Sequence, residues 1–258
     1  METYRILSRE TYPRNAHLDY FCTMAQPYAG LTVPVDITDF YQAVEARKVP
    51  FFLSFLYCAA RAANGVPELR QRLRGEEILE YDHCPTSHTV ALEDGTYCYC
   101  ALRSDLPFSD YLPHAIQTQE AAKAQRSLDD GGEEDALPLL FISTLPWVHY
   151  EALVQPTPSP ADTNPRITWG RFRREGDRVV LPVSLLCHHG LVDGLHMAHF
   201  YANLERELAQ WVEKGEGRWT RSKTKQPAGH RGASVSRWFS LEDRGIRGYL
   251  DGMVTVHQ

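Results

Sequence analysis

The segment from Val179 to Val212 constrains the fold most strongly, because its hydrophobic pattern changes period along the way. Residues 179–186 are mostly β-branched or leucine, which predicts a buried strand. From Met197 the apolar residues recur at helical spacing, and Gly215 is a suitable stop. The ten residues between hold three histidines and one carboxylate, in the order Cys187-His188-His189-Gly190-Leu191-Val192-Asp193-Gly194-Leu195-His196. We therefore expect a strand-to-helix junction that places polar groups at the rim of a sheet, where sites are commonly built.

Composition narrows the classes of protein and partner. The 258 residues suit one large domain or two small ones, and contents of 43% apolar and 23% charged residues are typical of globular proteins. The net charge of −6 argues against nucleic acid or an anionic membrane as the main partner. The N-terminus has no apolar stretch of signal-peptide length, and the longest apolar run, Phe51 to Ala60, is too short to span a bilayer. The six cysteines lack metal-finger spacing, so we expect reduced thiols in a cytoplasmic protein.

The remaining segments predict alternating strands and helices. Leu31 to Ile37 is an expected edge strand, because Pro34 has no donor for a strand ladder. Helical patterns cover residues 39–47, 50–63, 107–127 and, more briefly, 67–73. Strand patterns cover 78–81, 86–92 and 96–102 as one meander, then 138–150, and then a hairpin of 167–173 with 178–186. Residues 129–135 form an expected acidic surface loop, and 155–165 a proline-rich loop. We expect one domain over residues 1–215 and a partly disordered extension over 216–258.

The residues of the junction allow three uses. A metal site is disfavoured by spacing, because helical zinc histidines stand four apart and need a further ligand. The histidines could instead be structural groups that local hydrogen bonds satisfy in the core. A third use is a general base, since imidazole can take a proton at neutral pH. The chain has no serine-elbow motif, no phosphate loop and no Gly-x-Gly-x-x-Gly.

Four segments together resemble one known family. His188 to Gly194 fits His-His-x-x-x-Asp-Gly, the signature of the type A chloramphenicol acetyltransferases and their coenzyme-A-dependent relatives. Ile142-Ser143-Thr144-Leu145-Pro146-Trp147 is similar to a second segment of that family. Further matches are Glu175-Gly176-Asp177-Arg178 with Leu181-Pro182, and Arg14 with His17, Tyr20 and Phe21. The order and approximate spacing of all four agree over residues 1–215.

The resemblance implies a fold, an assembly and a reaction. The implied fold is an α/β (α+β) two-layer sandwich, with helices on one face of a mixed β-sheet. The implied assembly is a homotrimer with sites between subunits. The implied enzyme moves an acetyl group from acetyl-CoA, its co-substrate, to a hydroxyl of chloramphenicol, which is an antibiotic-resistance activity. No metal is implied.

The resemblance also assigns roles to individual residues. His189 matches the general base, and Ser143 matches the donor to the tetrahedral oxyanion. Asp193 and Arg14 match a buried ion pair that orders the site, and Thr168 matches a threonine that binds the transition state through water. The other histidines of this region, His188, His196 and His199, are assigned to structure.

Departures from the family pattern concern the acceptor pocket. The implied acceptor contacts are Tyr20, Phe21, Tyr97 and Tyr99, and the implied coenzyme A contact is Phe172. Phe21 stands where the family usually has tyrosine, and Tyr99 stands where a small residue is usual. We therefore expect retained acetyl transfer with reduced activity on chloramphenicol. The alternatives are a non-catalytic binding trimer of the same fold and a dihydrolipoyl acyltransferase-like catalytic domain.

Overall fold

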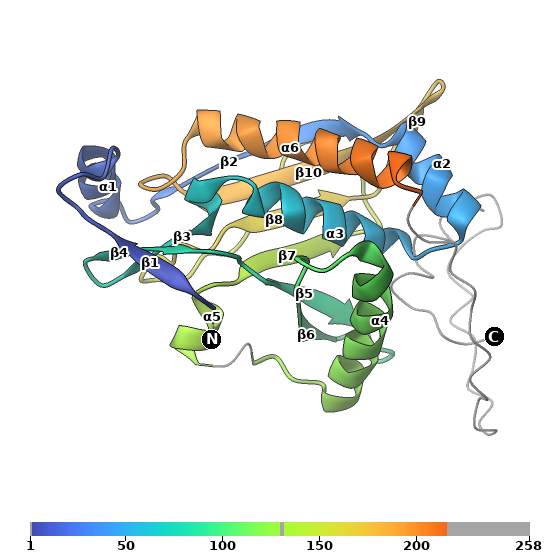
Figure 1. Cartoon of the computed structure of the whole chain (residues 1–258), viewed down its shortest axis with the longest axis horizontal. Coiled ribbons are helices and arrows are strands. Elements are labelled where there is room, and N and C mark those ends of the chain that lie inside the picture. The colour runs from blue at the N-terminus through green and yellow to red at the C-terminus, as the bar shows by residue number, and fades with distance from the viewer. Residues whose placement is uncertain (1, 130–131, 216–258) are drawn as a thin grey trace.

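A seven-stranded mixed sheet forms one layer of the fold, in a computed structural model that describes residues 2–129 and 132–215 (Figure 1). Its strand order is β2-β10-β8-β7-β5-β6, with β9 paired to β10. The bounds are β2 (Tyr28–Asp36), β10 (Arg178–His188), β8 (Arg166–Gly170), β7 (Leu140–Leu145), β5 (Thr86–Ala91), β6 (Tyr97–Leu102) and β9 (Arg173–Glu175). The central strand β7 is parallel to both neighbours, and the other pairs are antiparallel.

Four helices cover one face of this sheet (Figure 1). They are α2 (Thr38–Arg47), α3 (Phe51–Asn64), α4 (Phe108–Gln125) and α6 (Gly194–Glu213). Helix α3 is apolar on almost every side, and it packs on the sheet beside α6; the Phe55 and Trp169 rings, for example, lie 4.9 Å apart. The predicted two-layer α+β sandwich is confirmed, and so are the predicted helices over 39–47, 50–63 and 107–127 and the one that follows the histidine turn.

A second, three-stranded sheet corrects two predictions. It consists of β1 (Tyr4–Leu7), β4 (Glu77–Tyr81) and β3 (Gln71–Arg74), in the order β1-β4-β3. The predicted meander over 78–102 is therefore wrong: only β5 and β6 form its hairpin, because β4 pairs with strands outside that segment. The predicted helical piece over 67–73 is a 3₁₀ turn, η1 (Pro67–Arg70), after which the chain enters β3. Local pattern cannot reveal such partners, since pairing depends on long-range contacts.

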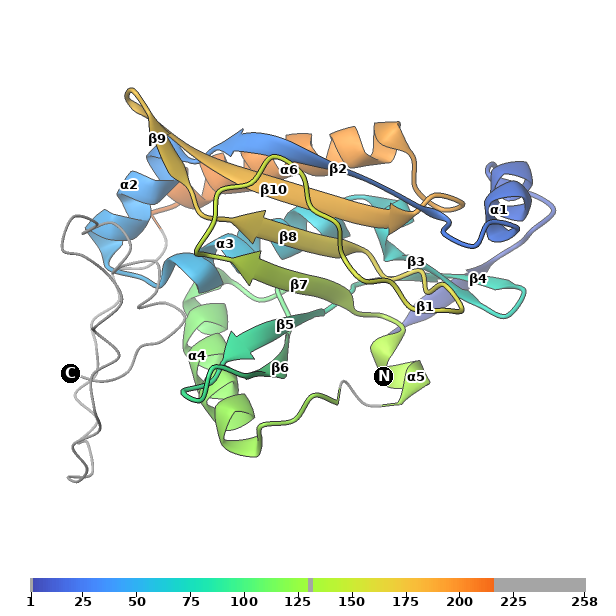
Figure 2. The same cartoon turned by 180° about the vertical axis from the view of Figure 1, so that it is seen from behind.

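Several other predicted segments are shorter or better defined than expected. The strand predicted over 138–150 ends at Leu145, and the chain then crosses the sheet face opposite the helices (Figure 2). We call residues 146–165 the strap. The predicted edge strand with Pro34 is confirmed, because β2 ends the strand order. A short helix, α5 (Glu133–Ala136), falls in the predicted acidic loop, and α1 (Asn15–Cys22) precedes β2.

The described residues contain no helix long and apolar enough to cross a membrane. All six cysteines lie in the described part of the chain, and all are free thiols. The predicted extension over 216–258 lies outside the described residues.

Candidate active site

The end of β10 holds His189 in a tight turn before α6. Strand β10 ends at His188, which is buried and whose Nδ1 accepts a hydrogen bond from the Gly190 N–H at 3.2 Å. The Gly190 Cα is closely approached, because a Cβ there would lie 2.7 Å from a methyl group of Leu18 in α1. The backbone N–H of His189 donates to the Pro27 carbonyl at 2.7 Å. These contacts fix the turn between α1 and β2.

The His189 ring has a defined tautomer. Its Nδ1 lies 2.9 Å from the Val192 carbonyl oxygen. A carbonyl oxygen can only accept, so Nδ1 carries the hydrogen of a neutral ring and Nε2 keeps a lone pair. The Phe21 ring packs against the imidazole, with ring centroids 4.0 Å apart. His189 is half-buried, and Nε2 is therefore available to take a proton from a bound group.

Arg14 ties the turn to the start of α6. It pairs with the Asp193 carboxylate, and it also donates to the His189 carbonyl at 2.9 Å and the Gly190 carbonyl at 3.4 Å. The structure thus brings together the predicted ion pair, with 13% of the Arg14 side chain and 35% of the Asp193 side chain exposed. Three of the five Arg14 donors bind this one turn.

Asp193 also begins helix α6. Its carboxylate accepts a hydrogen bond from the Leu195 N–H at 3.0 Å, and its own N–H donates to His196 Nδ1 at 3.1 Å, which together form a capping box. Partial burial raises the pKa of Asp193, but its interactions with His196 and Arg14 and the hydrogen bond from the Leu195 N–H outweigh burial and hold the pKa below its usual range. His196 thus has a structural role at this cap, while His199 is exposed.

A row of hydroxyl groups crosses the outer sheet face. Ser143 on β7 is in register with Thr168 on β8, which is in register with Ser184 on β10, which is in register with Thr32 on β2. Side chains in register point to the same face, and Ile142 and Ile167 beside them face the helices. Thr168 is buried, while Ser143 is half-buried. Within the described residues the Ser143 hydroxyl makes no hydrogen bond.

Two residues of the strap, which sequence reasoning missed, hold Thr168. The Tyr150 hydroxyl donates to the Thr168 carbonyl at 2.9 Å, and the Thr168 hydroxyl donates to Gln155 Oε1 at 3.2 Å. Burial raises the pKa of Tyr150, so its hydroxyl stays protonated as a donor. Neither residue belongs to a motif, and only the proline-rich composition of their surroundings marked the segment as a loop.

The predicted aromatic contacts fall into two places. Tyr20 and Phe21 lie on α1 beside His189, with their ring centroids 5.2 Å apart. Tyr97 and Tyr99 lie on β6, at the opposite edge of the sheet from β2. Phe172 is in neither place, because its ring packs against Tyr41 and Phe51.

Apart from Phe172, the predicted site residues form two separate groups. The base group is Arg14, Tyr20, Phe21, His189 and Asp193, and the sheet-face group is Tyr97, Tyr99, Ser143 and Thr168. The offset between His189 and Ser143 has two components. Along the strands, Ser184 is in register with Thr168 and precedes His189 by five residues, which is roughly 17 Å. Across the sheet, the strand β7 that holds Ser143 lies two strands from β10, which is about 10 Å. Figure 2 shows α1 at one end of the molecule and β6 toward the other. One chain does not bring His189 and Ser143 together.

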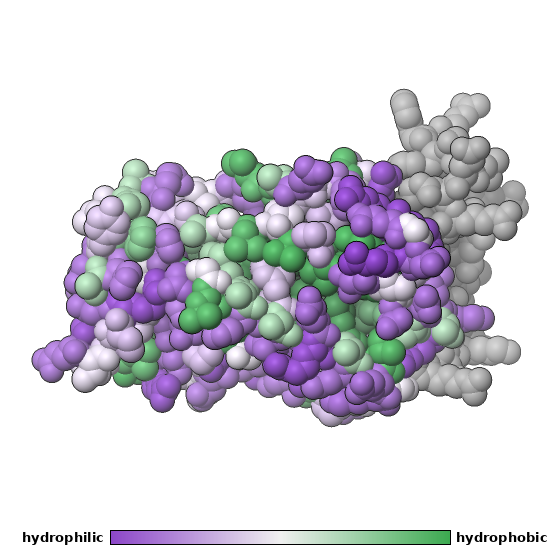
Figure 3. Space-filling model, turned by 90° about the horizontal axis from the view of Figure 1, so that it is seen from above, coloured by the Kyte–Doolittle hydropathy of each residue, from purple (hydrophilic) through white to green (hydrophobic). Residues whose placement is uncertain are grey.

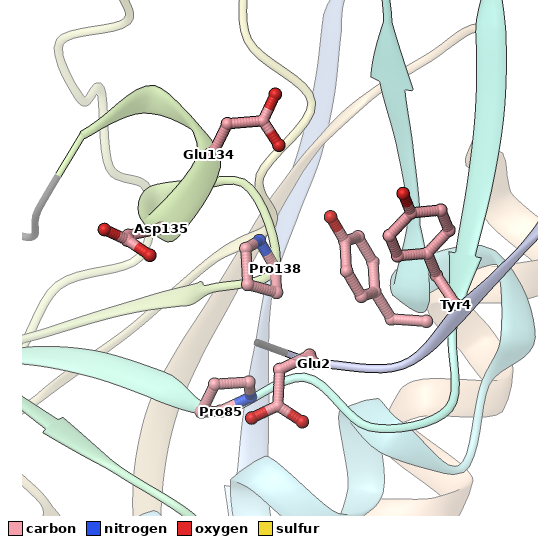
Figure 4. Close-up of a pocket in the computed structure, with 7 residues that line it drawn as sticks. Glu2, Tyr4, Pro85, Glu134, Asp135 and Pro138 are labelled. Carbon is pink, nitrogen blue, oxygen red and sulfur yellow. The ribbon is translucent and has the colours of Figure 1, made fainter.

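Two hollows on the described part of the surface are lined by none of the predicted site residues. A hollow of about 170 Å³ beside the small sheet is lined by Glu2, Tyr4, Tyr81, Pro85, Glu134, Asp135 and Pro138 (Figure 4), and none of the predicted site residues lines it. The side that is uppermost in Figure 1 mixes hydrophilic residues with small apolar groups (Figure 3). In the described part of the chain, no three possible metal ligands lie together.

Comparison with known proteins identifies the family. The profile of the family described as "Chloramphenicol acetyltransferase" matches residues 2–205. A chloramphenicol acetyltransferase of Klebsiella sp is 26% identical over 211 residues, which are 81% of this chain and 95% of that protein. Chloramphenicol acetyltransferase 2 of Escherichia coli is 29% identical over 198 residues, which are 76% of this chain and 92% of that protein.

A solved structure shows the same fold. It is a chloramphenicol acetyltransferase that superposes with a TM-score of 0.72 at 22% identity, over 80% of this chain and all of that one. This chain belongs to the chloramphenicol acetyltransferase family of acyltransferase enzymes.

Proposed function

We propose that this chain moves the acetyl group of acetyl-CoA to a hydroxyl of chloramphenicol or a similar small acceptor. The observation that carries the proposal is the His189 ring: Nδ1 commits its hydrogen to the Val192 carbonyl, and Nε2 keeps the lone pair that a general base needs. Phe21 and Arg14 hold the ring and its backbone in place. The membership of the family supports acetyl transfer as the reaction.

In the proposed reaction, His189 Nε2 takes the proton of the acceptor hydroxyl while that oxygen bonds to the thioester carbon. Ser143, whose hydroxyl proton is uncommitted among the described residues, donates a hydrogen bond to the oxyanion that forms. The C–S bond then breaks, and the sulfur leaves with the proton that His189 carried. The products are the acetyl ester and coenzyme A with a free thiol.

We further propose that each site is completed by a second copy of the chain, in the homotrimer that the family resemblance implies. The separation of His189 from Ser143 within one chain supports this arrangement. The acceptor oxygen must lie within about 3 Å of the base, and the thioester carbonyl oxygen that becomes the oxyanion must lie within about 3 Å of its donor, on the same reacting carbon. A neighbouring copy would bring its sheet face, with Ser143, Thr168, Tyr97 and Tyr99, to the His189 turn. The coenzyme A contact of Phe172 stays a prediction.

Thiol release from acetyl-CoA tests the proposed function. The wild-type chain is assayed with chloramphenicol and a panel of simple alcohols, and the acetylated products are identified by mass spectrometry. Release with at least one acceptor, abolished by His189→Ala and kept by His199→Ala at an exposed histidine, is the expected result. Release with no acceptor, or full activity of His189→Ala, would favour the non-catalytic trimer. Acetylation of dihydrolipoamide alone would favour the dihydrolipoyl acyltransferase alternative.

A further inference from the structure

The hydroxyl row under the strap is a one-way chain of hydrogen bonds. The Tyr150 hydroxyl has one hydrogen, and the Thr168 carbonyl takes it. The Ser184 hydroxyl must then donate to Tyr150 at 3.1 Å, and the Thr32 hydroxyl to Ser184 at 2.7 Å. Gly170 permits this packing, because a Cβ there would lie 2.8 Å from the Tyr150 ring. These hydrogen bonds fix the strap on the sheet.

Gln155 ends this arrangement with an unused donor group. Its Oε1 accepts the hydroxyl hydrogen of Thr168, so Thr168 Oγ1 offers only lone pairs to a further group. The Gln155 Nε2 group has two hydrogens and, among the described residues, no hydrogen-bond partner. Gln155 is half-buried, and Thr168 is adjacent to Ser143 across one pair of strands, which stand about 4.8 Å apart.

The strap keeps Gln155 at this position from both ends. Its first residues are bound to the segment directly after β8, where the Arg171 N–H donates to the Val148 carbonyl at 2.7 Å. Its far part is held by Thr157, whose hydroxyl donates to Gln26 at 3.0 Å, beside the turn that binds His189. A side chain anchored between these two contacts is presented to the sheet face with little freedom, which favours selective recognition.

We propose that Gln155 is a specificity-determining residue of the acceptor site: its Nε2 group donates to a hydrogen-bond-accepting oxygen that stands beside the reacting hydroxyl. The inference rests on the proposed acetyl transfer and on Ser143 marking the reacting end. It names the acceptor class as an alcohol with a second oxygen close to the acetylated one. An alcohol without that oxygen leaves a half-buried donor unpaired and reacts more slowly.

A matched pair of acceptors and two variants test this proposal. Chloramphenicol has a second hydroxyl near the reacting one, and 1-deoxychloramphenicol lacks it on the same skeleton. The wild type is expected to prefer chloramphenicol by about 2- to 12-fold in kcat/KM, the worth of one neutral hydrogen bond. Gln155→Glu keeps an oxygen for Thr168 but loses the donor, and Gln155→Met loses both. Both variants are expected to bring the preference close to one. The thermal midpoint of unfolding is expected to stay unchanged in Gln155→Glu and to fall in Gln155→Met, which leaves the buried Thr168 hydroxyl without its acceptor.

Each other outcome overturns the proposal in a distinguishable way. If Gln155→Glu keeps the wild-type preference and only Gln155→Met loses it, Gln155 acts through Thr168 and not on the acceptor. A wild type without preference also overturns it. If the chain acetylates simple alcohols but neither member of the pair, the proposed acetyl transfer stands and the role of Gln155 falls. If it acetylates nothing, both fall together.

Discussion

Asp193 combines two duties that two substitutions can separate. Its carboxylate accepts the Leu195 N–H at the start of α6, and it pairs with Arg14. Asp193→Asn keeps an oxygen for the helix cap and loses the charge, while Asp193→Ala loses both. The loss of unfolding free energy in Asp193→Asn measures the contribution of the charge, and the further loss in Asp193→Ala measures the contribution of the helix cap.

The burial of the pair sets the expected magnitudes. An exposed ion pair is worth about 0–1 kcal/mol, while breaking a buried one costs about 3–5 kcal/mol. Arg14 is nearly buried, but 35% of the Asp193 side chain is exposed to screening solvent, so we expect Asp193→Asn to cost about 1–2 kcal/mol. The lost cap adds about 1 kcal/mol, so Asp193→Ala is expected to cost about 2–3 kcal/mol.

Urea unfolding at pH 7, followed by circular dichroism, measures these costs. Glu175→Gln is the matched control, since its pair with Arg173 is more exposed and should contribute less than about 0.5 kcal/mol. Because the pKa of Asp193 is held below its usual range, its charge stabilises the fold above pH about 4 and this contribution is lost at lower pH. The difference in unfolding free energy between the wild type and Asp193→Asn should therefore become smaller at acidic pH. An Asn variant as stable as the wild type would refute the reasoning.

Three further predictions concern the sheet and its faces. Ser143→Ala is expected to lower kcat by about 10²–10³ in steady-state assays, and an unchanged kcat would remove Ser143 from oxyanion binding. Burial lowers the pKa of His88 to about 3. Below pH about 6.5 the unfolded chain therefore binds a proton at this histidine that the folded chain does not bind, and the free energy of unfolding decreases as the pH is lowered. His88→Phe should flatten that dependence in urea unfolding at pH 7 and 5, and an equal slope would contradict it. Gly170→Ala should cost about 1–3 kcal/mol in thermal unfolding, because its Cβ would overlap the Tyr150 ring, and an unaltered midpoint would show that the strap can move aside.

The base group was predictable because its residues carry local signals. The change of period between Val183 and Met197 located the turn, and the spacing from His188 to Asp193 supplied the resemblance. Arg14 lies far away in sequence, and only the resemblance linked it to Asp193, which the ion pair now matches. Strand and helix positions were predictable for the same reason, as β10 and α6 show.

The strap and the small sheet were not predictable from pattern. Tyr150 and Gln155 lie in a segment without periodicity, and their places depend on contacts with β8 and β10 that no local rule contains. Strand β4 has an ordinary strand pattern, yet its partners come from the N-terminus and from β3. The separation of His189 from Ser143 follows from register, which the sequence alone does not define.

Mixed assemblies test most directly whether His189 and Ser143 of different copies share one site. His189→Ala and Ser143→Ala chains, each expected to be nearly inactive alone, are co-expressed with different tags and purified as mixed oligomers. If each site takes its base from one chain and its Ser143 from the next, every mixed trimer has one restored site out of three, and the expected activity is about one third of wild type. Activity no higher than that of either variant alone would contradict a site shared between copies.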